Sequence, residues 1–332
     1  MPSDNELLSN EYEQRINRVI DYIVRNLDQE LSLESLADIA FFSKFHFHRI
    51  FSALTGETTN EFVRRVRLEK SAYLLIFDRK KSITDIANDC GFSSSQNFAK
   101  AFKLYFGITP SVLRKTKDFR RFETLQNAIG DIEKSKMGNM GRNSGNGISS
   151  LAPYTKNSNV EQHRISLATQ VRNIAMNVDI QLVPDRTVAY IRHIGPMLPE
   201  LISPTFMRLL MWAGPRELMH EQADILGVSW SYPDLTPESK SRYDACITVP
   251  DDFQPDSTVS VQQLRGGKCA VYQCEILGNN FQEAWIELMR DWLPTSGYQP
   301  DERPSYEVYH NQDGEGADTT WVIDFCLPVK PL

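Results

Sequence analysis

Two short polar stretches carry side chains that are suited to contact with DNA. The first supplies His46, His48 and Arg49, and the second supplies Ser95, Gln96, Asn97 and Lys100. Arginine can hydrogen-bond both acceptors of guanine, glutamine and asparagine can pair with adenine in the same two-point manner, and lysine neutralises phosphate. These residue types predict double-stranded DNA as a partner. For any one of them, the alternative is an ordinary solvated position on a helix surface.

The two stretches belong to two copies of one helical unit. Residues 33–40 predict a short helix capped by Ser32, residues 41–43 a turn, and residues 44–53 the start of a second helix, which is the spacing of a helix-turn-helix. Because one chain would carry both units, their second helices could occupy successive major grooves about 34 Å apart without dimerisation. The repeat is visible in Leu36, Ala37 and Phe42, which return as Ile86, Ala87 and Phe92.

A single carboxylate in an aromatic strand is a separate candidate site. Glu307 lies in the alternating run SYEVY. A carboxylate beside aromatic faces would attract a cationic, flat or amphipathic molecule through charge and cation–π attraction. Spacing alone favours the alternative, a glutamate at a rim in contact with water. Other aromatic residues of this half, most of them expected in the core, include Tyr190, Trp212, Tyr272 and Trp321.

Metal, cofactor and disulfide chemistry is not expected. His46 and His48 are two positions apart and would point to different sides of a helix. The five cysteines form no CxxC pair, and an odd number of them favours free buried thiols.

Length and charge indicate two domains with different partners. The 332 residues suit two cores, and the net charge of −7 is unevenly distributed. Residues 11–121 carry 19 basic and 14 acidic residues, a balance of +5, whereas residues 175–332 carry 11 and 23, a balance of −12. The basic segment can approach phosphate and the acidic one is repelled by it. No apolar run approaches the roughly 20 residues that span a bilayer, and the first residues lack a secretory signal, so we expect a cytoplasmic protein with no membrane partner.

The pattern along the chain predicts a multidomain fold. The first half has helical spacing throughout and is expected to be all-α. Residues 126–173, which are rich in Gly, Asn and Ser, predict a flexible linker. The second half alternates strands and helices, and a strand-turn-strand-helix unit at residues 178–213 returns at residues 259–292. We therefore expect a double helix-turn-helix domain followed by an α+β domain of two repeated strand-strand-helix units.

The run CGFSSSQNFAKAFKLYFGITPSVLRK is similar to the signature of the AraC/XylS regulator family. The resemblance covers about residues 11–118 and implies a seven-helix DNA-binding domain whose long middle helix spans about residues 59–77. It implies sequence-specific transcription regulation, with RNA polymerase as a candidate further partner. Several amino acids at the base-reading positions differ from those common in the family. The resemblance therefore predicts the fold better than it predicts the DNA sequence that is bound. The base-reading positions of the family match Phe45, His48, Arg49, Ser95, Gln96, Asn97 and Lys100.

Five segments of the second half, RHIGP, RYDACITV, LRGGKCAVY, WLPTSGY and SYEVYHN, resemble the GyrI-like effector-binding domain. The resemblance covers about residues 175–330 and implies a small-molecule pocket of the kind found in Rob-type and BmrR-type multidrug-responsive regulators. It places Glu307 at the pocket floor and Trp321 on its wall, and Tyr190, Trp212 and Tyr272 are further candidate lining residues. Met197 follows Gly195-Pro196 where the family often has tyrosine, and the second copy reads Ile276-Leu277-Gly278. The resemblance therefore predicts the fold but not the shape of the pocket or the identity of its ligand.

Three roles for the second domain follow. As an effector domain, it would change how the first domain engages DNA or RNA polymerase, a coupling typically worth about 1–3 kcal/mol. As a hydrolase, it would use Glu307 as a base, but no nucleophile–base pair or metal-ligand spacing accompanies that residue, so we expect no enzyme. As an interaction module, it would cover a partner with its acidic surface. The effector role is the leading hypothesis.

Overall fold

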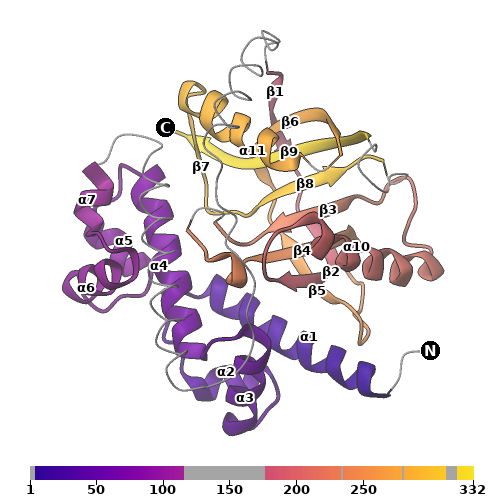
Figure 1. Cartoon of the computed structure of the whole chain (residues 1–332), viewed down its shortest axis with the longest axis horizontal. Coiled ribbons are helices and arrows are strands. Elements are labelled where there is room, and N and C mark those ends of the chain that lie inside the picture. The colour runs from indigo at the N-terminus through magenta and orange to yellow at the C-terminus, as the bar shows by residue number, and fades with distance from the viewer. Residues whose placement is uncertain (1–3, 116–175, 233–234, 279, 312–319) are drawn as a thin grey trace, which may run out of the picture.

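The computed structural model describes residues 4–115, 176–232, 235–278, 280–311 and 320–332, and it forms a helical domain packed against a sheet domain (Figure 1). The linker expected at residues 126–173 lies outside the described residues. Within the described part of the chain, no helix has both the length and the apolar character needed to cross a bilayer.

Polar caps and glycines set the limits of the helices. Ser32 and Thr58 accept hydrogen bonds from the first turns of α2 and α4, while Gly56 and Gly107 end α3 and α6 with left-handed φ angles of 67° and 72°. The expected middle helix is α4. The described helices of this domain are α1 (Asp4–Arg25), α2 (Leu33–Ile39), α3 (Lys44–Thr55), α4 (Thr59–Phe77), α5 (Ile83–Asp89), α6 (Ser95–Phe106) and α7 (Pro110–Lys115).

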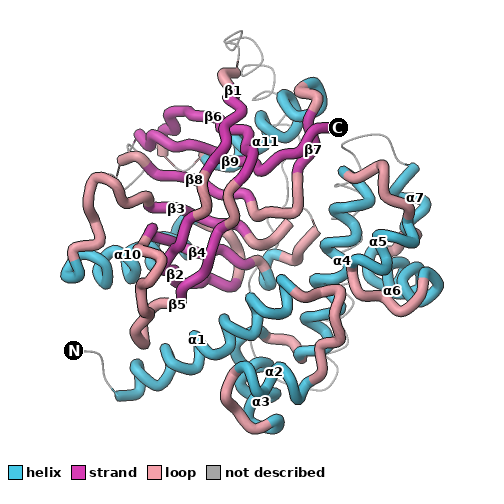
Figure 2. Tube along the Cα trace, turned by 180° about the vertical axis from the view of Figure 1, so that it is seen from behind, coloured by secondary structure: helices cyan, strands magenta, loops and turns pink. Residues whose placement is uncertain are grey.

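Two small cores share the long helix α4. Phe47 and Phe51 of α3 pack on Phe62 of α4, and Phe98 and Phe102 of α6 pack on the other end of α4 with α5 and α7. Figure 2 shows the two groups of short helices at opposite ends of α4. The duplicated helix-turn-helix is confirmed, and one continuous helix joins its two copies.

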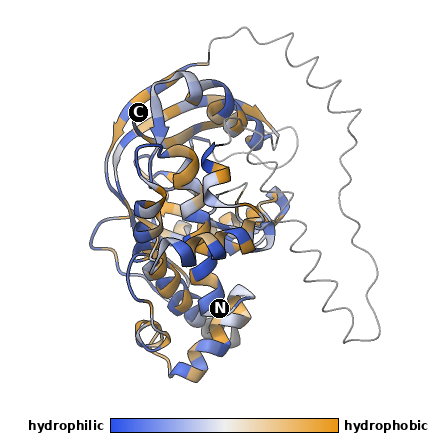
Figure 3. Cartoon of the chain, turned by 90° about the vertical axis from the view of Figure 1, so that its left-hand side faces the viewer, coloured by the Kyte–Doolittle hydropathy of each residue, from blue (hydrophilic) through white to orange (hydrophobic). Residues whose placement is uncertain are grey.

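The second domain is an antiparallel sheet with helices on one face. Its strand order is β1-β6-β9-β8-β3-β4-β2-β5, and β7 pairs with β9. The elements of this domain carry both hydrophobic and hydrophilic residues (Figure 3), and the central strands β2 and β4 are buried along most of their length. The described elements are β1 (Val178–Val183), β2 (Arg186–Ile194), α10 (Pro199–Ala213), β3 (Ile225–Ser229), β4 (Arg242–Thr248), β5 (Ser260–Leu264), β6 (Gly267–Leu277), α11 (Phe281–Glu287), β7 (Tyr298–Pro300), β8 (Ser305–Tyr309) and β9 (Thr320–Pro331), with short helical turns at Gly214–Arg216, Glu238–Lys240, Leu288–Trp292 and Leu293–Thr295.

The predicted internal repeat is confirmed. The first copy consists of β1, β2, α10, β3 and β4, and the second consists of β5, β6, α11, β8 and β9. The first strand of each copy pairs with the other copy, because β1 pairs with β6 and β5 pairs with β2. The two copies meet where β3 pairs with β8, near the centre of the sheet. Helices α10 and α11 pack on one face over separate halves of the core. The centre of the sheet between them is where the copies can form a shared site.

The opposite face of the sheet meets the helical domain through a buried ion network. Arg192 of β2 donates two hydrogen bonds of 2.7 Å to Asp244 of β4 and forms an ion pair of 2.9 Å with Asp21 of α1. The side chains of Arg192 and Asp244 are 1% and 0% exposed. Burial acts to lower the pKa of Arg192, but Asp21 and Asp244 outweigh it and the pKa is raised. Tyr190 adds a 2.7 Å hydrogen bond to Asp21.

Removing the cation of this network should destabilise the whole chain. Arg192→Met leaves Asp21 and Asp244 without their buried partner, and breaking a buried pair in this way costs about 3–5 kcal/mol. We expect a clear fall in the urea midpoint of unfolding, followed by tryptophan fluorescence. Arg290→Met is the matched control, because the side chains of Arg290 and Asp291 are 54% and 50% exposed and such pairs contribute about 0–1 kcal/mol. Equal midpoints for the two variants would show that the network does not hold the domains together.

Candidate functional site

The predicted reading face of α3 is exposed. Phe45 is 84% exposed, and His48 and Arg49 also lie on the surface, whereas Phe47 is buried in the first core. Buried phenylalanines on one side of α3 therefore fix the helix so that the other side is free to contact a partner. His46 packs at the edges of aromatic rings, 6.0 Å from Tyr12 and 5.2 Å from Phe42.

The matching face of α6 is only partly free. Gln96, Asn97 and Lys100 are exposed, and Ser95 is half-buried. The Ser95 hydroxyl donates to Thr84 at 3.2 Å, and the Asn97 amide donates to Ser93 at 3.1 Å. These local hydrogen bonds pre-orient two of the four predicted contact residues at the amino-terminal end of α6.

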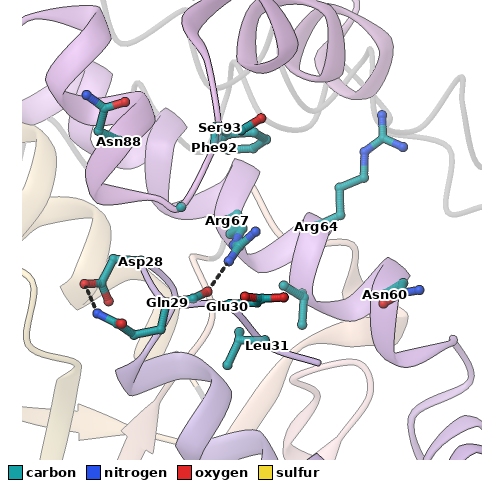
Figure 4. Close-up of a pocket in the computed structure, with 12 residues that line it drawn as sticks. Asp28, Gln29, Glu30, Leu31, Asn60, Arg64, Arg67, Asn88, Phe92 and Ser93 are labelled. Atoms are coloured by element: carbon teal, nitrogen blue, oxygen red, sulfur yellow. Dashed lines mark hydrogen bonds between the residues drawn. The ribbon is translucent and has the colours of Figure 1, made fainter. Parts of the chain in front are cut away.

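A cleft between the two helix-turn-helix units was not predicted (Figure 4). It has a volume of about 590 Å³ and lies between the 28–31 loop, α4 and the 88–93 turn. Arg67 closes its floor by donating to the carbonyls of Leu27 (2.9 Å) and Gln29 (2.8 Å), while Arg64 is exposed beside it. The signal for Arg64 was available, because it is an exposed cation on the helix that joins the two reading units.

Glu307 lies at the junction of the two repeats, on β8 opposite Gly227 of β3. It is 7% exposed, so the rim position in contact with water that spacing alone favoured is wrong. Its Oε2 accepts hydrogen bonds of 2.7 Å from the hydroxyls of Tyr243 and Tyr309, and its Oε1 accepts one of 2.8 Å from the Trp285 indole. Strands β4 and β8 and helix α11 thus converge on one carboxylate.

Gly227 makes the approach of Tyr243 possible. A Cβ atom at this position would lie 1.7 Å from the Tyr243 hydroxyl oxygen, and Tyr243 is itself buried. Burial and the neighbouring Glu307 raise the pKa values of both tyrosines well above the usual value, so both remain protonated and donate to the carboxylate. A side chain at residue 227 would break this arrangement.

Aromatic rings surround the carboxylate on the face that carries the helices. Phe206 of α10 lies 5.4 Å from the Tyr309 ring, and Phe281 of α11 lies 6.3 Å from the Trp321 ring. Trp321 is also 5.9 Å from Tyr309. The Trp321 indole nitrogen is buried with no hydrogen-bond partner among the described residues. We call Phe206, Tyr243, Phe281, Trp285, Glu307, Tyr309 and Trp321 the Glu307 cluster.

Three of the predicted lining residues form hydrogen bonds with partners outside the Glu307 cluster. Tyr190 faces the opposite side of the sheet and bonds Asp21 at the domain interface. Trp212 donates to Asp256 at 2.8 Å, and Tyr272 donates to Glu287 at 3.2 Å. Of the predicted set, the structure brings together Glu307 and Trp321. Sequence reasoning missed five cluster members, although Tyr309 follows Glu307 by two residues and so shares its face of the strand.

Comparison with known proteins gives matches to both halves. Residues 36–116 match the model of a helix-turn-helix domain, and residues 176–330 match the GyrI-like small molecule binding domain. The second half is similar to the DNA gyrase inhibitor of Escherichia coli K12, with 30% identity over 159 residues, 47% of this chain and 98% of that protein.

The first half is similar to two further proteins from Escherichia coli. The Tn10 TetD protein is 40% identical over 102 residues, 31% of this chain and 73% of that protein. The right origin-binding protein of strain K12 is 36% identical over 107 residues, 32% of this chain and 37% of that protein. With the duplicated reading unit and the repeated sheet already established, the chain belongs to the AraC-type helix-turn-helix transcription regulators that carry a GyrI-like small-molecule binding domain.

Proposed function

We propose that this regulator reads base pairs with α3 and α6 and binds a cationic, amphipathic effector in the Glu307 cluster. The observation that carries the proposal is a buried carboxylate whose three hydrogen-bond donors, Tyr243, Tyr309 and Trp285, are all uncharged. The effector then changes the engagement of DNA, and RNA polymerase is a further proposed partner. Binding without turnover is the proposed activity of the second domain.

The exposed side chains on α3 and α6 support direct reading of bases. Arg49 can make the two-point contact with guanine, and exposed Phe45 offers an apolar surface to a thymine methyl group. Lys100 on α6 can neutralise a phosphate, as can Arg64 beside the cleft between the two units. The α6 polar residues Ser95, Gln96 and Asn97, together with His48 on α3, complete the proposed contact set.

Loss of either proposed DNA contact should weaken specific binding. Arg49→Ala removes a base contact, which costs about 1–3 kcal/mol and relaxes preference at one position of the site. Lys100→Ala removes a phosphate contact, which should weaken binding to all sequences and reduce the slope of log affinity against log salt concentration by about 1. The assay is electrophoretic mobility shift with a promoter fragment selected by the wild type. Arg290→Ala, an exposed cation of the other domain, is the control, and wild-type affinity in both test variants would refute the assigned faces.

The electrostatics of the Glu307 cluster favour a cation. Among the described residues, no cation is a hydrogen-bond donor to this buried carboxylate, and burying a charge without an opposite charge costs free energy. A ligand cation would supply that opposite charge, and the surrounding rings would add cation–π attraction. The unpartnered Trp321 nitrogen offers a hydrogen-bond donor to the same ligand.

Access to Glu307 requires Trp285 to move. With three donors in place and 7% of the residue exposed, a ligand cation can reach the carboxylate only by displacing one of them. Trp285 lies on α11, which runs directly into a turn of π-helix at Leu288–Trp292. Single turns of π-helix are rare, and they are frequent at functional sites. We therefore assign Trp285 as the side chain that opens the cluster.

Neutralising the carboxylate should remove selectivity for cations. Glu307→Gln keeps a hydrogen-bond acceptor but loses the charge, and hydrogen bonds to charged groups contribute about 1.5–3 kcal/mol, or roughly 10- to 150-fold in affinity. We expect that loss for a benzyl quaternary ammonium probe and no comparable loss for its uncharged carbon isostere. Quenching of tryptophan fluorescence measures both affinities. Equal losses for both probes would argue against charge recognition, and recovery of a chemically altered probe would argue for catalysis.

A further inference from the structure

We propose that the β3–β4 connection, residues 230–241, is the element through which the ligand domain positions recognition helix α3, with Lys240 and Thr236 as its positioning residues. This inference rests on the proposed function of the Glu307 cluster, because it assigns the route by which an occupied pocket acts on DNA reading. The connection is described except at residues 233–234.

Lys240 caps the carboxyl end of α3 from the other domain. Its Nζ donates to the carbonyls of Thr55 at 2.8 Å and Gly56 at 2.9 Å. The last carbonyls of a helix have no partner within the helix and carry partial negative charge, so a cation there is stabilising. Helix α3 has no basic residue in its own last turn, whereas α6 has Lys103. Helix α3 therefore receives from the ligand domain the positive charge that α6 has in its own last turn.

Gly56 keeps this contact close. A Cβ atom there would lie 2.8 Å from Lys240 Nζ, and the φ angle of +67° disfavours any side chain. The cap of α3 is thus shaped to admit the lysine of the neighbouring domain.

Thr236 makes a second contact, which is fully buried. Its hydroxyl donates to Glu69 of α4 at 2.9 Å, and Glu69 is paired at 3.0 Å with Arg65. Arg65 in turn is paired at 2.6 Å with Glu57, the residue that follows Gly56. Both contacts of the connection therefore converge on the end of α3, one directly and one through a buried chain of charges.

The same connection reaches both helix-turn-helix units. Tyr232 stacks on Tyr73 with ring centres 4.5 Å apart, and Leu235 is buried in the core of the second unit. At the other end, the Arg242 guanidinium lies 5.5 Å from the ring of Phe62, which contacts Phe51 of α3. A displacement of the connection would therefore change how the two reading helices sit relative to each other.

The Glu307 cluster and this connection share two strands. The connection leaves β3 two residues after Gly227, which pairs with Glu307, and it enters β4 directly before Tyr243, which donates to Glu307. Lys240 is three residues from Tyr243, a span of roughly 10 Å in extended chain. A ligand that reaches the carboxylate once Trp285 has moved lies beside the Tyr243 hydroxyl, which is bonded to the same carboxylate. A shift of Tyr243 or of β4 is then passed to residues 236–241, which contact α4 and the end of α3.

The test uses the full chain, a wild-type promoter fragment and the benzyl quaternary ammonium probe. In the wild type, saturating probe should change DNA affinity by about 5- to 150-fold, the usual range of coupling between sites. In Lys240→Met and Thr236→Val the change should fall below about twofold, while the probe's own affinity stays at the wild-type value. Lys240→Arg, which keeps the cation, should restore the response.

Lys103→Met is the matched control, because it removes the equivalent charge from the last turn of α6 without touching the connection. It should leave the response to the probe intact even if DNA affinity falls. A wild-type response in Lys240→Met would overturn the proposal.

A probe-free measurement separates this proposal from the pocket assignment. Amide hydrogen exchange over residues 52–56, at the end of α3, should accelerate in Lys240→Met and return to the wild-type rate in Lys240→Arg. If the probe fails to bind the wild type, the effector assignment fails and the positioning role is judged on exchange alone. Unchanged exchange in Lys240→Met would refute it independently of any ligand.

Discussion

Neighbouring residues of a β-strand point to opposite faces of the sheet, and on β4 this alternation connects the two functions of the molecule. Tyr243 faces the helices and donates to Glu307, while Asp244, the next residue, faces the other domain and holds Arg192. One strand therefore forms part of the Glu307 cluster with one side and part of the domain interface with the other. Because both sides are buried and hydrogen-bonded, β4 cannot adjust to one without affecting the other.

The buried charged groups at the domain interface and in the Glu307 cluster have different partners. At the domain interface Arg192 stands between Asp21 and Asp244, so the buried charges are paired and the contact is closed. In the Glu307 cluster, the carboxylate accepts hydrogen bonds from neutral donors only among the described residues. The charges at the interface are therefore paired within the protein, whereas the Glu307 carboxylate has no cation among its hydrogen-bond donors in the described part of the chain, which is why we propose a cationic ligand there. A cation that enters the cluster acts on a strand whose other face is already fixed to α1.

Much of the fold follows from sequence pattern, because caps, turn glycines and apolar spacing are local signals. Ser32, Thr58 and Gly56 mark the helix ends that the structure shows, and the repeats predicted both duplications. The residues that join the domains could not be found in this way. The net charge of residues 175–332 predicts that this half is repelled by phosphate. It does not show that Asp21 of the basic half pairs with Arg192 of the acidic half. That pairing depends on which strand faces which helix.

The Glu307 cluster was only partly predictable for the same reason. Glu307 stood out as an acid in an aromatic strand, but Tyr190 and Tyr243 are both strand tyrosines, and only sheet order and register place one at the interface and the other at the carboxylate. Gly227 has no side chain that could mark it as functional. Its role is seen only in the structure, where the Tyr243 hydroxyl occupies the space that a Cβ atom would take.

The proposal that ligand binding in the Glu307 cluster controls the reading helices can be tested most directly by measuring the distance between α3 and α6. Spin labels at Leu54 of α3 and Leu104 of α6, both exposed, would report that distance by double electron–electron resonance in the full chain, with the partly exposed Cys274 replaced by serine. The account predicts that saturating quaternary ammonium probe shifts the distance distribution in the wild type and leaves it unchanged in Glu307→Gln. An unchanged distribution in the wild type, with the probe shown to be bound, would contradict it.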